Sequence, residues 1–184
     1  NSNRQEHGEG KLFYANGDSF TGIFKNDERY RGTQLYGGGD SFKGEFKNNL
    51  KLDGIYRWKN GNSFEGLWKN GQPHYGSYRY SDGVRYEGYF IHRENNILRH
   101  GQGNLFFSDG GRFEGEYRED EAYRGKLYYT NGNRYEGSFK GKRPVPHGQG
   151  KLYFADGKIY VGTVLNGFAE GEGRIIFQGK DYPC

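Results

Sequence analysis

The chain has 184 residues, of which 32% are hydrophobic and 18% aromatic, and its 27 basic and 23 acidic residues give a net charge of +4. So many rings and so small a net charge are not typical of intrinsic disorder, where aromatics are scarce and net charge is high. The near balance of charge also argues against nonspecific nucleic-acid binding, which depends on many cationic contacts to phosphate.

A short phrase recurs along the chain, beginning with NGDSFTGIF at residues 16–24. In each copy a ring is followed two residues later by Gly and preceded by Gly at three and at ten residues. These rings are Phe20, Phe42, Phe64, Tyr86, Phe113, Tyr135 and Tyr160. Such regular spacing predicts one array over residues 1–184, with about eight repeats that open near residues 8, 30, 52, 74, 101, 123, 148 and 171.

Each repeat predicts one β-hairpin. Phe20, Gly22 and Phe24 are two residues apart, so a strand places them on one face. The segment before them alternates as well, and the Asn16-Gly17 pair between the segments is typical of a tight turn with positive φ angles. The Gly between two rings predicts a slot in which the aromatic side chain of a neighbouring strand lies.

The predicted fold is all-β: an elongated, single-layer, twisted antiparallel sheet of tandem hairpins. Because one hairpin is not stable alone in water, its neighbours must supply the stability. The Gly-x-Gly that opens a repeat loses its first Gly at four places, which are occupied by Tyr30, Leu52, His74 and Tyr123. This predicts two kinds of connection, a tight one with a bulky plug and a longer one that needs Gly.

The phrases HGQGNLFFSDGGRFEGEY (100–117) and HGQGKLYFADGKIYVGTV (147–164) resemble the MORN repeat (membrane occupation and recognition nexus). The resemblance extends over about residues 7 to 179. It implies a twisted sheet of hairpins with a groove along one side. It also implies a scaffold in the cytoplasm, associated with a membrane or the cytoskeleton and often dimeric, or a module joined to an enzyme.

The aromatic face is the predicted protein-binding surface, since nothing covers one side of a single-layer sheet and large exposed apolar patches mark interaction sites. The expected occupant is a peptide or a helix in the groove. On this prediction Trp68→Ala weakens binding and leaves the fold largely intact. The predicted contact residues are Trp58, Phe64, Trp68, Tyr80, Tyr86, Phe90, Phe107, Phe113 and Tyr117.

Two long connections, at residues 90–101 and 140–148, carry cations that would suit an anionic phospholipid. These cations are Arg93, Arg99, Lys140, Lys142 and Arg143. The alternative is that both connections are solvated loops. The acidic stretch 114–121 is expected to be a solvated face, because strand alternation spreads its carboxylates over two faces. We therefore predict no metal, no cofactor and no catalytic residue.

The favoured function is a non-catalytic protein-binding scaffold. One alternative is the targeting module of an enzyme, such as a lipid kinase or a SET-type methyltransferase, whose catalytic domain is absent; others are a phospholipid-binding module and a carbohydrate-binding array. A homodimer is expected through a terminal edge strand at about residues 173–178, because unpaired edges invite strand addition. The chain has no Met and one cysteine, Cys184, which together suggest an excerpt of a longer intracellular protein.

Overall fold

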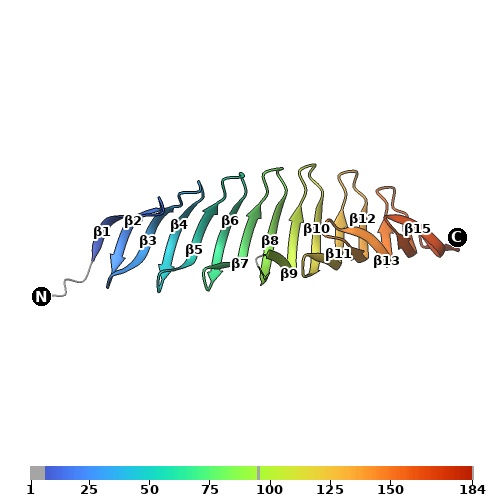
Figure 1. Cartoon of the computed structure of the whole chain (residues 1–184). Coiled ribbons are helices and arrows are strands. Elements are labelled where there is room, and N and C mark those ends of the chain that lie inside the picture. Colours follow the sequence, from blue (N-terminus) through green and yellow to red (C-terminus); the bar gives the residue numbers. More distant parts are fainter. Residues whose placement is uncertain (1–6, 95, 184) are drawn as a thin grey trace, which may run out of the picture. The chain divides into compact units, whose positions relative to one another are not determined.

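The computed structural model describes residues 7–94 and 96–183 (Figure 1), so Cys184 lies outside the described residues. The chain divides into two compact units, Asn1–Asp82 and Gly83–Cys184. The described residues form β-strands and turns and no helix, which confirms the predicted all-β class. Among them no helix is long and apolar enough to cross a membrane.

In each unit the strands lie side by side in chain order, and each is antiparallel to its neighbours, which confirms the tandem hairpins (Figure 1). The first unit contains β1 (Gly8–Phe13), β2 (Ser19–Lys25), β3 (Glu28–Leu35), β4 (Ser41–Lys47), β5 (Leu50–Arg57), β6 (Ser63–Lys69) and β7 (Gln72–Arg79). The second contains β8 (Arg85–Arg93), β9 (Asn96–Phe106), β10 (Arg112–Arg118), β11 (Glu121–Tyr128), β12 (Arg134–Lys140), β13 (Val145–Tyr153), β14 (Ile159–Leu165), β15 (Phe168–Phe177) and β16 (Lys180–Pro183).

The strand that was expected to form an unpaired terminal edge has a partner on both sides. Residues 173–178 lie mostly in β15, which pairs with β14 and also with β16, where Arg174 faces Pro183 and Phe177 faces Lys180. The edge-strand prediction is therefore wrong for this segment. The sequence around β16 carries no ring-Gly-ring triplet, so the repeat pattern did not reveal the strand.

A row of glycines crosses the sheet of each unit, because Gly faces Gly in the registers from β1 to β7 and from β8 to β15. Gly22 pairs with Gly10 on one side and with Gly32 on the other. A Cβ added to Gly22 would lie 2.6 Å from the Cα of Gly32 and 2.8 Å from the Cζ of Phe20. Gly22 thus lies under a ring of its own strand, two residues earlier, and not under a ring of a neighbouring strand as predicted, whereas Gly32 lies under the same Phe20 ring from the neighbouring strand.

The core is a ladder of rings one layer deep. Phe20 meets Phe24 edge to face at 5.2 Å between centroids, and it meets Phe46 of the next hairpin at 5.5 Å. Phe42 repeats the arrangement with Phe46 and Trp68. In the second unit the same contacts join Tyr86 to Phe90 and Tyr117, and Phe113 to Tyr117 and Phe139. Edge-to-face contact suits the ring quadrupole, so each ring stabilises two neighbours.

Most residues with positive φ angles lie outside the Asn-Gly and Asp-Gly turns for which such angles were predicted. In the turn between β1 and β2 Gly17 has φ 85°, while Asn16 instead accepts a hydrogen bond from the amide of Asp18 at 3.1 Å. The two-residue turns between hairpins have positive φ at both positions, as at Asn26-Asp27 (51° and 66°). Asn and Asp tolerate this conformation better than most side chains, which explains their place there.

Two kinds of connection are present, as predicted, and the difference is the size of a bulge. Phe24 pairs with Arg29 and Ile23 with Arg31, so Tyr30 is the one unpaired residue. Leu52, His74 and Tyr123 are skipped in the same way. Tyr30, Leu52 and Tyr123 are exposed, so these side chains are not plugs. Where Gly-x-Gly survives between two hairpins, two or more residues bulge out and the first Gly has positive φ, as at Gly101 and Gly171.

Candidate functional site: the ring face of the sheet

The ring face, meaning the face that carries the ring-Gly-ring triplets, has a buried floor. Six of the nine predicted contact residues belong to this floor and are 0–6% exposed: Phe64, Trp68, Tyr86, Phe90, Phe113 and Tyr117. Trp68 packs on Phe42 and Phe64, and its indole N–H donates to the carbonyl of Gly54 at 3.3 Å. We therefore expect Trp68→Ala to disturb the fold as well as any binding.

A second set of rings lies on the same face beside the loops that join β1 to β2, β3 to β4 and so on. We call Tyr14, Tyr36, Trp58 and Tyr80 the loop-side rings of the first unit. Residues two apart along a strand point to the same face. Trp58 therefore shares the ring face with Tyr56, which pairs with both Phe42 and Phe64. The three remaining predicted contacts, Trp58, Tyr80 and Phe107, lie here and are half-buried.

Three of the loop-side rings, Tyr36, Trp58 and Tyr80, form a continuous aromatic strip with Tyr56 and Tyr78, the rings two residues before Trp58 and Tyr80. Centroid distances are 5.6 Å from Tyr36 to Tyr56, 4.7 Å from Tyr56 to Trp58 and 5.1 Å from Trp58 to Tyr78. Tyr78 then meets Tyr80 at 4.7 Å. Sequence reasoning missed Tyr36, Tyr56 and Tyr78 as contacts, although the alternation of the opening segments was a signal for them.

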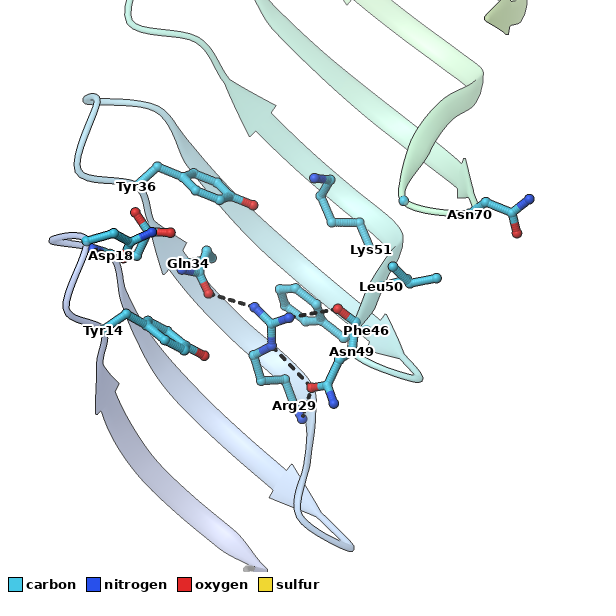
Figure 2. Close-up of a pocket in the computed structure, with 12 residues that line it drawn as sticks. Tyr14, Asp18, Arg29, Gln34, Tyr36, Phe46, Asn49, Leu50, Lys51 and Asn70 are labelled. Atoms are coloured by element: carbon cyan, nitrogen blue, oxygen red, sulfur yellow. Dashed lines mark hydrogen bonds between the residues drawn. The ribbon is translucent and has the colours of Figure 1, made fainter.

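A cavity of about 430 Å³ lies on the ring face of the first unit (Figure 2). Tyr14 and Tyr36 line it from the loop side, and Arg29 and Lys51 line it from β3 and β5. Its floor includes Gln34, which is 2% exposed and faces Phe20 and Phe42 in the register. The next two hairpins have Tyr at this position, Tyr56 and Tyr78. The shorter Gln side chain leaves room that a Tyr ring would fill.

Arg29 is held in this cavity by neutral partners. Its Nη1 donates to the Gln34 Oε1 at 2.8 Å, and its Nη2 donates to the Asn49 carbonyl at 2.7 Å (Figure 2). Its Nε also donates to the Asn49 Oδ1, at 3.3 Å. The guanidinium lies 4.8 Å from the centre of the Phe46 ring. Among the described residues no carboxylate pairs with Arg29, so its charge is not neutralised by an ion pair.

Lys51 is the second cation of the cavity, and it lies among rings. Its Nζ is 5.0 Å from the Trp68 ring centre, 5.2 Å from Tyr56 and 5.9 Å from Tyr36, distances at which a cation is attracted to a ring face. It forms no ion pair with any described residue. Burial, and then the charge of Arg29, lower the pKa of Lys51. The ammonium is thus less well solvated than a surface lysine.

The acids near the cavity are engaged with the backbone. Asp18 accepts a hydrogen bond from the amide of Gly37 at 2.9 Å. Asp40 accepts from the amide of Lys59 at 2.8 Å and from the Tyr56 hydroxyl at 2.7 Å. Burial, and then this hydrogen bond to Asp40, raise the pKa of Tyr56. Burial also raises the pKa of Tyr36, an effect that Arg29 opposes and that Asp18 and Asp40 reinforce. Both phenols therefore stay protonated at neutral pH.

The second unit has a smaller cavity, of about 260 Å³, on its own ring face. It is lined by Phe107, Leu127, Tyr129 and Arg143 among others, with the Arg143 guanidinium 5.3 Å from the Phe107 ring centre. Here the opening strands carry Leu where the first unit carries Gln and Tyr. This cavity is therefore less polar than the one around Arg29.

The cations predicted to bind lipid are distributed over different environments. Arg99 is 6% exposed and its Nε donates to Asp120 Oδ1 at 2.5 Å, while its Nη2 donates to the carbonyl of Lys142 at 2.8 Å. Lys142 Nζ lies 3.3 Å from the second oxygen of Asp120. Arg93 is exposed and pairs with Glu119. Lys140 is exposed, and Arg143 lies on the ring face. Three of the five cations are thus paired with carboxylates.

The repeat seen in the sequence and in the sheet matches one family. The sequence model described as MORN repeat matches residues 5–19, 64–85, 95–112, 135–159 and 160–182, which together are more than half of the chain. The chain belongs to the MORN-repeat family. Among curated proteins, none matches this MORN array significantly.

The chain also matches solved structures, one of them with a TM-score above 0.5. The TCP domain of SAS-4 (dCPAP) from Drosophila melanogaster, solved in complex with a proline-rich motif of Ana2 (dSTIL), is 12% identical, covers 96% of this chain and 88% of that chain, and has a TM-score of 0.53. The wild-type TCP10 domain of Danio rerio CPAP is 15% identical over 98% and 88%, with a TM-score of 0.32. The G-box domain of the microcephaly protein CPAP is 12% identical over 96% and 98%, with a TM-score of 0.35. At this identity the first similarity shows a shared fold alone.

Proposed function

We propose that this MORN array is a non-catalytic scaffold that binds a segment of another protein on its ring face. The observation that supports this most is the aromatic strip Tyr36–Tyr56–Trp58–Tyr78–Tyr80, whose rings contact one another and are only half-buried. Trp and Tyr are the usual anchors of protein interfaces, because they bury a large area and lose little entropy.

The occupant that suits this strip is an extended peptide or one face of a helix. A row of rings on a sheet offers successive shallow surfaces, which a peptide in polyproline or extended conformation can contact with every second or third residue. The SAS-4 TCP domain, which has a similar fold, was solved with a proline-rich motif, and this supports the peptide alternative. Membership of the MORN family supports a location at a membrane or the cytoskeleton in the cytoplasm.

Site-specific photo-crosslinking tests the proposed face. A photoreactive phenylalanine analogue is placed at Trp58 on the ring face or, as the matched control, at Leu67 on β6, which is exposed on the opposite face. In cell extract we expect a crosslinked product of defined mass when the analogue is at position 58. No product of that mass should form when the analogue is at position 67. Equal crosslinking from both positions, or from position 67 alone, would contradict the proposal.

A further inference from the structure

We propose that the cavity around Arg29 and Lys51 binds the carboxylate of an Asp or Glu side chain carried by an extended segment of the partner. This rests on the proposed function, since the segment would lie on the same ring face. It goes further in assigning the partner an acidic residue and in giving this residue a site of its own.

The first argument is charge complementarity. The cavity holds two cations, of which Arg29 has neutral hydrogen-bond partners and Lys51 has no ion pair among the described residues. Asp18 is the one acid among the described residues that line it, and this carboxylate already accepts from the amide of Gly37. The residues that line the cavity thus carry a net positive charge, which an acidic side chain would neutralise.

The second argument concerns the donors that are left for a ligand. Arg29 donates its Nε–H and one N–H of each Nη to Gln34 and Asn49, so two of its five N–H groups remain. The ammonium of Lys51 and the hydroxyl of Tyr36 lie on the same side of the cavity (Figure 2). One ammonium and one hydroxyl match the two oxygens of a singly charged carboxylate. A phosphate dianion would be repelled more strongly than a singly charged carboxylate by the two nearby acids, Asp18 and Asp40, so the carboxylate is favoured.

The third argument is that the cavity adjoins the aromatic strip. Tyr36 lines the cavity and also contacts Tyr56, the next ring of the strip. Lys51 itself lies over the Tyr56 and Trp68 rings. A peptide could therefore place an acidic side chain between Arg29 and Lys51 while its flanking residues contact Tyr56 and Trp58. A small free anion would contact Arg29 and Lys51 but would not contact the rings of the strip.

Selection from a library of short random linear peptides displayed on phage, with the full chain as bait, tests this inference. We expect selected peptides to share Asp or Glu at one position. A selected peptide should bind the Lys51→Met variant about tenfold more weakly, because Met keeps the packing against the rings and removes the charge. Lys43→Met is the matched control, since Lys43 is exposed on the opposite face of the neighbouring strand β4. Circular dichroism melting checks that both variants are folded.

A double-mutant cycle then assigns the contact. Replacing the peptide's acid by the corresponding amide should weaken binding to the unchanged chain and have little further effect on the Lys51→Met variant. If the peptides share no acid and bind Lys51→Met normally, yet lose affinity for Trp58→Ala, the inference is wrong and the proposed function stands. If neither substitution affects them, both are wrong. Lys51-dependent sedimentation with phosphatidylserine vesicles, without any peptide selected, would identify a lipid site and overturn the inference.

Discussion

Phe20 lies over Gly32 so closely that a Cβ on this glycine would come within 2.6 Å of the Phe20 Cζ. The same relationship joins Phe42 to Gly54, where the corresponding distance is 2.9 Å. In each case the ring comes from one strand and the glycine from the next. The recurring phrase of the sequence is therefore a packing requirement, in which every ring needs a bare backbone beside it.

Gly32→Ala should destabilise the protein strongly. Its new methyl would collide with the Phe20 ring and also with Gly22, whose Cα would be 2.8 Å away. We expect a loss of about 2–3 kcal/mol in the free energy of unfolding, as for other overpacked cores. Urea denaturation measures it. Gly38→Ala is the control, because a Cβ there has no atom within 4 Å, and it should change stability by less than about 0.5 kcal/mol. Equal effects of the two substitutions would contradict the packing argument.

Asp120→Asn should cost far more stability than Glu119→Gln, although the two acids are adjacent. Asp120 neutralises the buried Arg99, with side chains 16% and 7% exposed, whereas Glu119 pairs with Arg93 on the surface, where the side chains are 56% and 65% exposed. Leaving a buried guanidinium without its counter-charge should cost about 2–3 kcal/mol, against less than about 1 kcal/mol for the surface pair. Thermal unfolding of both variants at neutral pH measures the difference. Similar losses would mean that Arg99 is solvated.

Tyr135→Phe should make the protein less sensitive to alkali. Burial, with a smaller effect of Tyr129, raises the pKa of Tyr135 to about 12, from 10.0 for the free side chain. Between these two values the unfolded chain loses the proton and the folded chain keeps it, so stability falls as pH rises from about 10 to about 12. Phe cannot ionise, and it occupies the same position in other repeats, as Phe113 does. Urea unfolding at pH 9, 10 and 11 should show a smaller decline for the variant, and an unchanged decline would refute the assignment.

Most of the fold could be predicted because the repeat ties local pattern to tertiary packing. Phe20, Gly22 and Phe24 show strand alternation, and their recurrence shows that neighbouring hairpins pack alike. β16 could not be predicted in the same way, because it pairs with β15 without carrying a ring-Gly-ring triplet. The positive φ angles at Asn26 and Asp27 were also missed, since Asn-Gly pairs elsewhere in each repeat are the stronger turn signal in a sequence.

The candidate site was predicted less well, because a ring pattern does not show which rings are covered. Trp58 and Trp68 look equivalent in the sequence, yet Trp58 is half-buried and Trp68 is 6% exposed. Trp68 is covered because it packs edge to face against Phe64 of its own strand and against Phe42 of β4. The cavity was missed for a related reason. It exists because Gln34 is shorter than Tyr56 and because Arg29 turns toward it, and neither fact follows from spacing.

The affinity of Trp58→Ala for a peptide selected on the full chain, measured by isothermal titration calorimetry beside its melting temperature, tests the central claim most directly. Our account predicts a loss of affinity of at least about tenfold, as for an aromatic anchor, with a melting temperature close to that of the unchanged chain. Leu67→Ala, on the opposite face, should leave both values unchanged. Unchanged affinity for Trp58→Ala in a folded protein would contradict binding on the ring face.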